Sequence, residues 1–465
     1  MQPKQNSNLK FNDMTAGSPT RLILTFALPL LVGNIFQQLY NLVDSVVVGN
    51  YVGKTALAGV GTSFPIIFMF TALFMGVGMG ATIMVAQYYG AGDHERVKKT
   101  ISTIYTAVMV GAIPLTLLGV FLCGPLLKLM LVPADTYREA YTYILIIFIG
   151  ITAMLGYNVN AGILQGVGDS KSPLLFLVIA CGINIVLDLL FVLVFGWGVA
   201  GVAIATIIAQ FFSWVFGIFF INKKYPDLEI NPFKFRFDRH LFWQAIRLGI
   251  PAGVQQAIFS LGIMVMQSLV NSYGSDFMAG FNGSNKIDTF AFMPIQSFAT
   301  AVTTFVGQNI GAGKYDRVKR GASVTLMMSI ICSIVIGVLL LFIGPFLMRL
   351  FSPDAAVIEA GMAYLYRILP FYAVLSLLFI INGVMRGAGE MIVPVISTMV
   401  SLWAARVPSA YLLAHFFGRD NMFFSYVIGW VLGAIIAIAY YLSGRWKNKS
   451  IVKKASINTE VNTAD

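Results

Sequence analysis

The chain has 465 residues, of which 58% are hydrophobic and only 11% are charged, whereas roughly 25% of residues are charged in soluble proteins. So few charged side chains cannot cover a water-facing surface, which excludes a soluble enzyme, a disordered protein and a secreted disulfide scaffold. A helical membrane protein is the class that remains. Each span needs roughly 20 apolar residues, so the length allows twelve spans with short loops.

Apolar runs between polar breaks predict twelve transmembrane helices and an all-α integral membrane fold. In chain order these helices are expected at residues 22–51, 55–87, 100–127, 139–163, 173–195, 198–221, 248–271, 278–307, 321–347, 357–381, 392–414 and 423–443.

Lysine and arginine are unevenly distributed over the predicted loops. With both termini inside, 23 of the 31 basic residues fall on the inner side, Arg386 among them, and five fall on the outer side. Because cytoplasmic loops are enriched in Lys and Arg, we expect a multi-pass protein of the plasma (inner) membrane with both termini cytoplasmic. This topology explains the net charge of +11 without a nucleic-acid partner.

An internal repeat divides the chain. The segment QYYGAGDHERVK at 87–98 matches QNIGAGKYDRVK at 308–319. The same offset relates Gly162, Gly166, Gly168 and Pro173 to Gly383, Gly387, Gly389 and Pro394. Chance similarity between apolar helices does not hold a constant offset across loops, so the chain is a duplication.

The duplication predicts the domain organisation. Residues 1–221 form an N-terminal lobe with spans one to six, 222–247 a cytoplasmic linker, and 248–465 a C-terminal lobe with spans seven to twelve and a tail. Six spans per lobe make the repeats parallel, so we expect two six-helix lobes related by a pseudo-twofold along the membrane normal. This is the architecture of an alternating-access transporter; a duplicated scaffold without transport is the alternative.

Two acids inside the first lobe are the main chemical signal. Asp44 on span one, Asp188 on span five and Thr206 on span six lie about seven or eight residues from the outer ends of their helices, or about 10–12 Å deep. Asn184 lies on the same helix face as Asp188. Two carboxylates without a base cannot both ionise cheaply, so one holds a proton or a cation binds. The oxygen ligands suit H⁺ or Na⁺.

A polar stripe on span one includes Asp44. Its other members are spaced as one helix face and are expected to face the interior of the lobe: Asn34, Gln37, Asn41 and Ser45.

The second lobe differs from the first. Span seven offers Gln255 and Gln256 but no acid, which argues against a second cation site. Four charged residues, Lys286, Asp288, Arg367 and Arg406, lie within the later spans, and we expect Asp288 to pair with a basic neighbour. Their net positive charge leaves room for an anionic or zwitterionic substrate group.

The loop and span motifs resemble those of the MATE family of multidrug and toxic compound extrusion transporters, bacterial type, over about residues 20–445. The resemblance rests on GAGDHERV at Gly90 and its copy at Gly311, GILQGVGDSKSP at Gly162 and its copy at Gly383, and GVAGVAIAT at Gly198. It implies a first-lobe cation site at Asp44, Asn184, Asp188 and Thr206. It also implies that span one bends at Pro29.

The function expected from these features is that of a secondary antiporter, not an enzyme. It would export organic, cationic compounds in exchange for H⁺ or Na⁺, with no other cofactor, as a monomer in contact with membrane lipid. The expected substrate pocket comprises Gln37, Tyr40, Asn41, Asn158, Gln255, Gln256, Lys286, Asp288 and Arg406. The alternative is a flippase for a lipid-linked precursor, whose phosphates would favour a basic cavity. An intramembrane enzyme or receptor would need a clustered His, Ser or Cys centre, which the sequence lacks.

Overall fold

The computed structural model describes residues 13–130, 132–231 and 234–452. Within these ranges every regular element is a helix. Eleven helices are long and apolar enough to cross a membrane, and a bent pair with a 55° break makes twelve. The predicted all-α membrane fold with twelve spans is therefore confirmed. Among the basic residues assigned to the inner side, four lie outside the described residues: Lys4, Lys10, Lys453 and Lys454.

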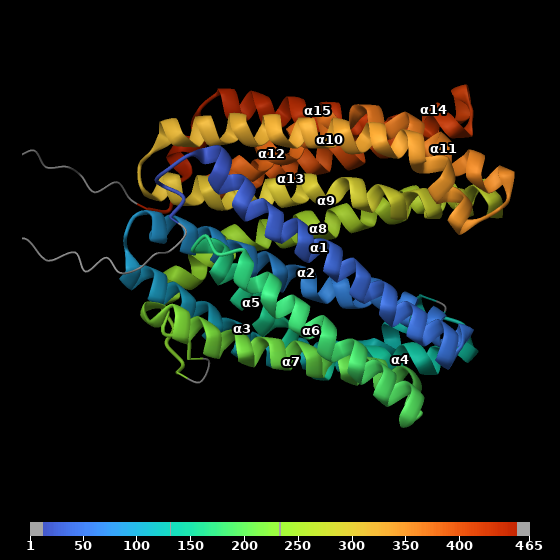
Figure 1. Cartoon of the computed structure of the whole chain (residues 1–465), viewed down its shortest axis with the longest axis horizontal. Coiled ribbons are helices and arrows are strands. Elements are labelled where there is room, and N and C mark those ends of the chain that lie inside the picture. Colours follow the sequence, from blue (N-terminus) through green and yellow to red (C-terminus); the bar gives the residue numbers. More distant parts are fainter. Residues whose placement is uncertain (1–12, 131, 232–233, 453–465) are drawn as a thin grey trace, which may run out of the picture.

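The helices of the two halves follow each other in the order that the duplication predicts (Figure 1). The first half comprises α1 (Pro19–Val47), α2 (Lys54–Gly90), α3 (His94–Leu129), α4 (Ala134–Ile149), α5 (Ile151–Gly166), α6 (Lys171–Leu189) and α7 (Gly198–Lys224). The second half comprises α8 (Arg239–Asn271), α9 (Ser275–Gly311), α10 (Tyr315–Phe351), α11 (Ala355–Ile368), α12 (Tyr372–Ala388), α13 (Ile392–Met399), α14 (Val407–Phe417) and α15 (Phe424–Leu442).

The described chain begins and ends at the same end of the bundle, which we call the terminal face (Figure 1). An even number of spans requires this. The loops that join α2 to α3, α5 to α6, α7 to α8, α9 to α10 and α12 to α13 lie at this face. These loops and the adjoining helix ends, together with Arg21, Arg445, Lys447 and Lys449 near the two ends of the described chain, contain more than half of the lysines and arginines of the sequence.

The two lobes exchange the beginnings of their first helices. Ile23, Phe26 and Ala27 of α1 are buried among apolar side chains of α9, α10 and α12. The start of α8, in turn, packs into the core formed by α2, α3 and α5. The predicted boundaries at 221 and 248 divide the sequence, but in space α1 and α8 each begin on the opposite lobe. Figure 1 shows α1 crossing from one lobe to the other.

The lobes touch at the terminal face through a symmetric crossing of α2 and α9. Gly90 lies against the backbone carbonyl of Gln308, and Gly311 lies against that of Gln87, so a Cβ atom at either glycine would clash. The Gln87 amide donates to the Gly387 carbonyl at 2.9 Å, and the Gln308 amide donates to the Gly166 carbonyl at 3.0 Å. The duplicated QxxGAG motif therefore closes this face.

The ends of the chain complete the crossing. The backbone N–H of Met14 donates to Gln308 Oε1 at 3.0 Å, and that of Ile451 donates to Gln87 Oε1 at 2.9 Å. Each glutamine thus binds its partner lobe through the amide nitrogen and a terminal segment through the amide oxygen.

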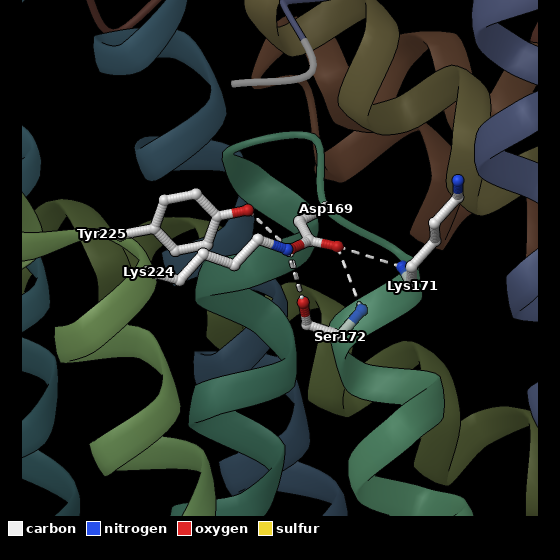
Figure 2. Close-up of polar contacts among 5 residues, drawn as sticks. All are labelled: Asp169, Lys171, Ser172, Lys224 and Tyr225. Carbon is white, nitrogen blue, oxygen red and sulfur yellow. Dashed lines mark hydrogen bonds and ion pairs between the residues drawn. The ribbon is translucent and has the colours of Figure 1, made fainter. Parts of the chain in front are cut away.

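A buried acid organises the loop before α6 (Figure 2). Asp169 accepts hydrogen bonds from the backbone N–H groups of Lys171 and Ser172 at 3.1 and 3.0 Å. The Lys224 ammonium and the Tyr225 hydroxyl contact the other carboxylate oxygen at 2.8 and 2.6 Å. Burial by itself would raise the pKa of Asp169, but these hydrogen bonds outweigh it and lower the pKa below its ordinary value.

Glu390 repeats this arrangement before α13, at the position that the duplication pairs with Asp169. It accepts from the backbone N–H of Ile392 at 2.9 Å and from the Tyr440 hydroxyl at 2.8 Å. Lys449 forms the ion pair at 2.9 Å. Burial opposes ionisation here as well, but the hydrogen bonds from Lys449 and Tyr440 keep the pKa of Glu390 lowered. The duplication thus extends to individual side-chain contacts.

Candidate functional site

Asp44 and Asp188 lie together inside the first lobe, as their equal predicted depth required. Asp44 is 9% exposed and Asp188 is fully buried. With its amide nitrogen turned toward the acids, Asn184 donates to Asp44 Oδ1 at 3.0 Å and to Asp188 Oδ2 at 3.2 Å. This orientation follows from the hydrogen-bond partners, because the opposite one faces oxygen with oxygen. One amide therefore bridges two acids.

A second layer of hydroxyl groups surrounds the acids. The Tyr40 hydroxyl donates to Thr206 Oγ1 at 3.2 Å, and the Thr206 hydroxyl donates to the Val202 carbonyl at 3.0 Å. Tyr143 of α4 lies close enough to both carboxyl groups to interact with them electrostatically. Four helices of the first lobe, α1, α4, α6 and α7, thus converge on one polar centre.

The donor set fits a proton or a small hard cation. Within the described part of the chain, neither Asp44 nor Asp188 has a basic group within ion-pair distance. Asp188 Oδ1 is buried and has no hydrogen-bond partner. Two carboxylates at this spacing repel unless a proton or cation lies between them. In the orientation that its partners favour, Asn184 is a donor, which suits a shared proton; Na⁺ would require the amide to rotate and present its oxygen.

The polar stripe on α1 does not face the lobe interior as a whole. Asn34 donates across the lobe boundary to Ser297 of α9 at 3.2 Å, and Asn41 is exposed. Ser45 donates to the Asn41 carbonyl of its own helix at 2.8 Å. The expectation for the stripe was wrong because α1 crosses between lobes, so one helix face meets different surroundings along its length.

The second lobe encloses a cavity of about 350 Å³. Gln255, Gln256, Asp288 and Arg406 line it, together with eight aromatic side chains. Gln255 also donates to Thr398 Oγ1 at 2.7 Å, which ties α8 to α13 beside the cavity.

Asp288 does not form the expected ion pair with a basic neighbour, neither with Arg406 nor with another basic residue of the described chain. The Tyr364 hydroxyl donates to Asp288 Oδ2 at 3.0 Å, while Asp288 Oδ1 has no partner. The Arg406 guanidinium lies over the Tyr426 ring, with Cζ 3.1 Å from the ring centroid. The prediction of a salt bridge was wrong because aromatic side chains, and not the opposite charge, are the direct partners of both groups.

A smaller cavity of about 280 Å³, which we call the central cavity, lies between the lobes. Asn158 of the first lobe and Gln256, Gln296 and Arg386 of the second line it. Gln256, Gln296 and Arg386 also line the second-lobe cavity, so the two spaces adjoin.

Arg386 is the residue that sequence reasoning missed. Its position near the end of a predicted span placed it with the basic residues of the inner loops, but it lies inside α12 and faces both cavities. Its buried Nε has no hydrogen-bond partner. The signal that could have identified it is that the matching position in the first half is Gln165, an uncharged residue that also lines the central cavity.

Four of the expected pocket residues line neither cavity. Lys286 is exposed and lies outside both cavities, so its side chain is not where we expected it. Tyr40 contacts the first-lobe acid site instead of a cavity, and Gln37 and Asn41 line neither cavity.

α1 is helical through Pro29, and its bending there stays a prediction.

Comparison with known proteins matches both halves of this architecture to one family. Residues 29–190 and 251–412 each match the MatE family model. The chain belongs to the MATE family. As a MATE protein it is a membrane transporter and not an enzyme. The two matched segments are equally long and are related by nearly the same offset as the motif copies, which agrees with the duplication.

Relatives cover the MATE chain almost completely. It is 31% identical over 443 residues to the probable multidrug resistance protein YpnP of Bacillus subtilis, covering 94% of this chain and 98% of the relative. It is 25% identical to the probable multidrug resistance protein NorM of Thermotoga maritima, covering 94% and 95%. A solved structure described as the outward-facing conformation of a multidrug resistance MATE transporter has a TM-score of 0.88 at 24% identity, covering 95% and 99%. This last likeness concerns the fold.

Proposed function

We propose that this MATE protein is a secondary antiporter that exports organic compounds, cationic ones among them, in exchange for H⁺ or Na⁺. The single observation that carries the proposal is the pair of buried acids, Asp44 and Asp188, bridged by Asn184 without a basic partner among the described residues. A membrane-buried carboxylate pair of this kind has a free-energy reason to bind a proton or cation. The multidrug names of YpnP and NorM support the export of varied organic compounds.

The contacts between the lobes indicate a step of the transport cycle in which the terminal face is closed. The basic residues near the terminal face support its placement in the cytoplasm. With that orientation, the Gly90–Gly311 crossing closes the cytoplasmic side. Opening this crossing while the lobes approach each other at the other side would complete alternating access.

Cation binding can act on the lobes through α1. Asp44 lies on the part of α1 within the first lobe, while the beginning of the same helix packs on the second lobe. A proton or Na⁺ that draws Asp44 and Asp188 together changes the position of α1 against α6. Because α1 joins both lobes, this local change favours one lobe arrangement over the other.

Replacing either acid by asparagine tests the coupling site. Asp44→Asn and Asp188→Asn remove the charge that a proton or cation neutralises, so we expect at least tenfold slower ion-driven efflux of ethidium from liposomes. The gradients of pH and Na⁺ are imposed separately to identify the ion.

The matched control is Asp276→Asn, which neutralises an exposed acid at the start of α9. It should retain wild-type transport, and insertion of all variants is checked by size-exclusion chromatography in detergent. Unchanged efflux in both Asp44→Asn and Asp188→Asn would overturn the coupling assignment.

A flippase for a lipid-linked precursor is the second candidate. Arg386 and Arg406, which both line the second-lobe cavity, favour it because guanidinium groups bind phosphates. Wild-type protein that moves a fluorescent polyprenyl phosphate across liposomes, but does not transport ethidium under either gradient, would favour this alternative.

A further inference from the structure

The second-lobe cavity combines an aromatic wall with unpaired polar groups. Its volume of about 350 Å³ lies within the range of roughly 300–1,000 Å³ that is usual for small-molecule sites. Rings at nearly right angles form one side of the cavity. The ring centroids of Tyr364 and Tyr426 are 5.5 Å apart, and those of Tyr426 and Trp430 are 6.2 Å apart. Such a wall accepts a flat apolar body.

Arg406 supplies a buried positive charge at this wall. Its side chain is 6% exposed, lines the cavity, and has a buried Nε without a hydrogen-bond partner. No acid lies within ion-pair distance of it in the described ranges. The Tyr426 ring covers one face of the guanidinium, which leaves its edge for in-plane contacts. A buried charge that lacks an anionic partner in the protein is stabilised when a ligand provides one.

Arg386 adds a second guanidinium at the junction with the central cavity. Asp288 is the one acid in the lining, so the cavity keeps one excess positive charge even when Asp288 is ionised. A monoanion neutralises this charge. A phosphate monoester, at about −1.5 to −2 near neutral pH, would exceed it.

The backbone around Arg406 is specialised in the same place. A π-helical segment, Val400–Arg406, separates α13 from α14 and ends at this arginine. The corresponding stretch of the first lobe, residues 179–185, lies within the regular helix α6. π-Helical turns often occur at functional sites because they redirect a side chain. The second lobe thus departs from the duplication where it turns Arg406 toward the cavity.

We propose that the second-lobe cavity binds the carboxylate of a small aromatic acid. Arg406 binds the carboxylate in the plane of its guanidinium, with Arg386 as the second positive group, and the aromatic wall holds the ring. The unpaired Asp288 Oδ1 accepts a hydrogen bond from a hydroxyl or amine on the far side of that ring. The inference names a substrate class for the proposed exporter and therefore rests on that function, although the binding itself does not require coupling.

Fluorescence titration of the purified full-length protein with 6-hydroxy-2-naphthoate tests the proposal. Three comparison probes keep the 6-hydroxynaphthalene body and change only the group at position 2: the methyl ester of the acid has no charge, 6-hydroxy-2-naphthyl phosphate has a larger negative charge, and (6-hydroxy-2-naphthyl)methylammonium has a positive charge. We expect the acid to bind at least tenfold more tightly than any of these. Equal or tighter binding of the ammonium, the phosphate or the ester would overturn the proposal.

Variants locate the binding site. Arg406→Gln should weaken binding of the acid about tenfold or more because a charge-assisted hydrogen bond is lost, and Arg406→Lys should retain part of the affinity. Lys286→Gln is the matched control, since it removes an exposed positive charge two residues from Asp288 and outside the cavity. Unchanged affinity in folded Arg406→Gln would refute the assignment.

Two further measurements keep the outcomes separate. If Arg406→Gln does not fold, Arg386→Gln must weaken binding of the acid without affecting the ester, or the proposal fails. Titration in detergent imposes no ion gradient, so it measures binding apart from transport. Selective binding of the acid by wild-type protein that shows no ion-driven efflux would support this proposal and overturn the antiport proposal, so the two failures are distinguishable.

Discussion

Single carboxylates have opposite roles in the two regions of this MATE protein. Asp169 and Glu390 at the terminal face have an ammonium partner and several hydrogen-bond donors, so they are satisfied as anions. Asp44 and Asp188 in the first lobe share one amide and have no positive partner in the described structure. The first pair stabilises the fold, whereas the second pair is suited to binding a proton or cation.

The Asp169 network predicts a pH-dependent stability. The pKa of Asp169 is lower in the folded protein than in the unfolded chain, so the carboxylate contributes fully to the free energy of unfolding above the unfolded pKa. This contribution is lost as the pH falls through the folded pKa. Asp169→Asn should lower the free energy of unfolding by about 2 kcal/mol near neutral pH, because a buried ion pair and its hydrogen bonds are broken. Thermal unfolding in detergent between pH 7 and pH 3 measures this effect.

The difference in unfolding temperature between wild type and Asp169→Asn should shrink as the pH falls from 7 to 3, because protonation of the unfolded wild-type carboxyl progressively removes the stabilisation that the charge provides. Asp227→Asn, an exposed acid near the same face, serves as the control and should unfold like the wild type. A difference that stays constant with pH would show that the carboxylate charge is not the source of the stabilisation.

Among elements, α1 and α8 decide how the lobes are joined, because each begins on the lobe opposite to its own. α8 approaches α2 through glycines: Gly249 lies so near α2 that a Cβ atom there would be 2.6 Å from Val77 Cα and 2.8 Å from the Gly76 carbonyl oxygen. Backbone atoms cannot move aside as a flexible side chain can. The small residues thus set the helix separation, as in other closely packed membrane helices.

Gly249→Ala should therefore destabilise the α2–α8 contact by about 1–3 kcal/mol, the usual cost of overpacking. Unfolding in detergent, followed by circular dichroism, measures this effect. Gly61→Ala is the control, because Gly61 also lies within a long helix but has open space around its Cβ position. There, alanine should be neutral or slightly stabilising. Equal effects at the two sites would contradict a role for close helix approach.

In the whole molecule, the α2–α9 crossing holds the lobes together at the terminal face. Gly311→Val should separate the lobes there, because the added side chain clashes with the Gln87 carbonyl and weakens the hydrogen bonds of both glutamines. Spin labels at positions 99 and 320, which are exposed and lie on α3 and α10, report the lobe separation. A cysteine-free background is used, since the chain has three cysteines.

We expect a longer label distance to gain population in Gly311→Val, with ethidium efflux reduced as the closed state is disfavoured. Gly182→Ala has space around the Cβ position and should leave the distance distribution unchanged. An unaltered distribution in Gly311→Val would mean that this crossing does not hold the lobes closed.

Much of the architecture could be predicted from the sequence because its signals are local or periodic. Apolar run length predicted the twelve spans, and the constant offset predicted two parallel lobes. Equal depth on different helices brought Asp44 and Asp188 together correctly, since acids at one level of a small bundle have few other partners. These inferences need only the chain order and the thickness of a membrane.

The tertiary structure alone decided which surfaces each helix meets. Sequence periodicity defines a helix face but not its neighbours, so the crossing of α1 divided a stripe that had been read as one surface. For the same reason Asp288 found Tyr364 and not Arg406, and Arg386 turned from a loop charge into a cavity residue. The packing of the lobes brings together residues that are distant in the sequence, and it thereby defines these surroundings. The residue pattern of a single helix contains no information about that packing.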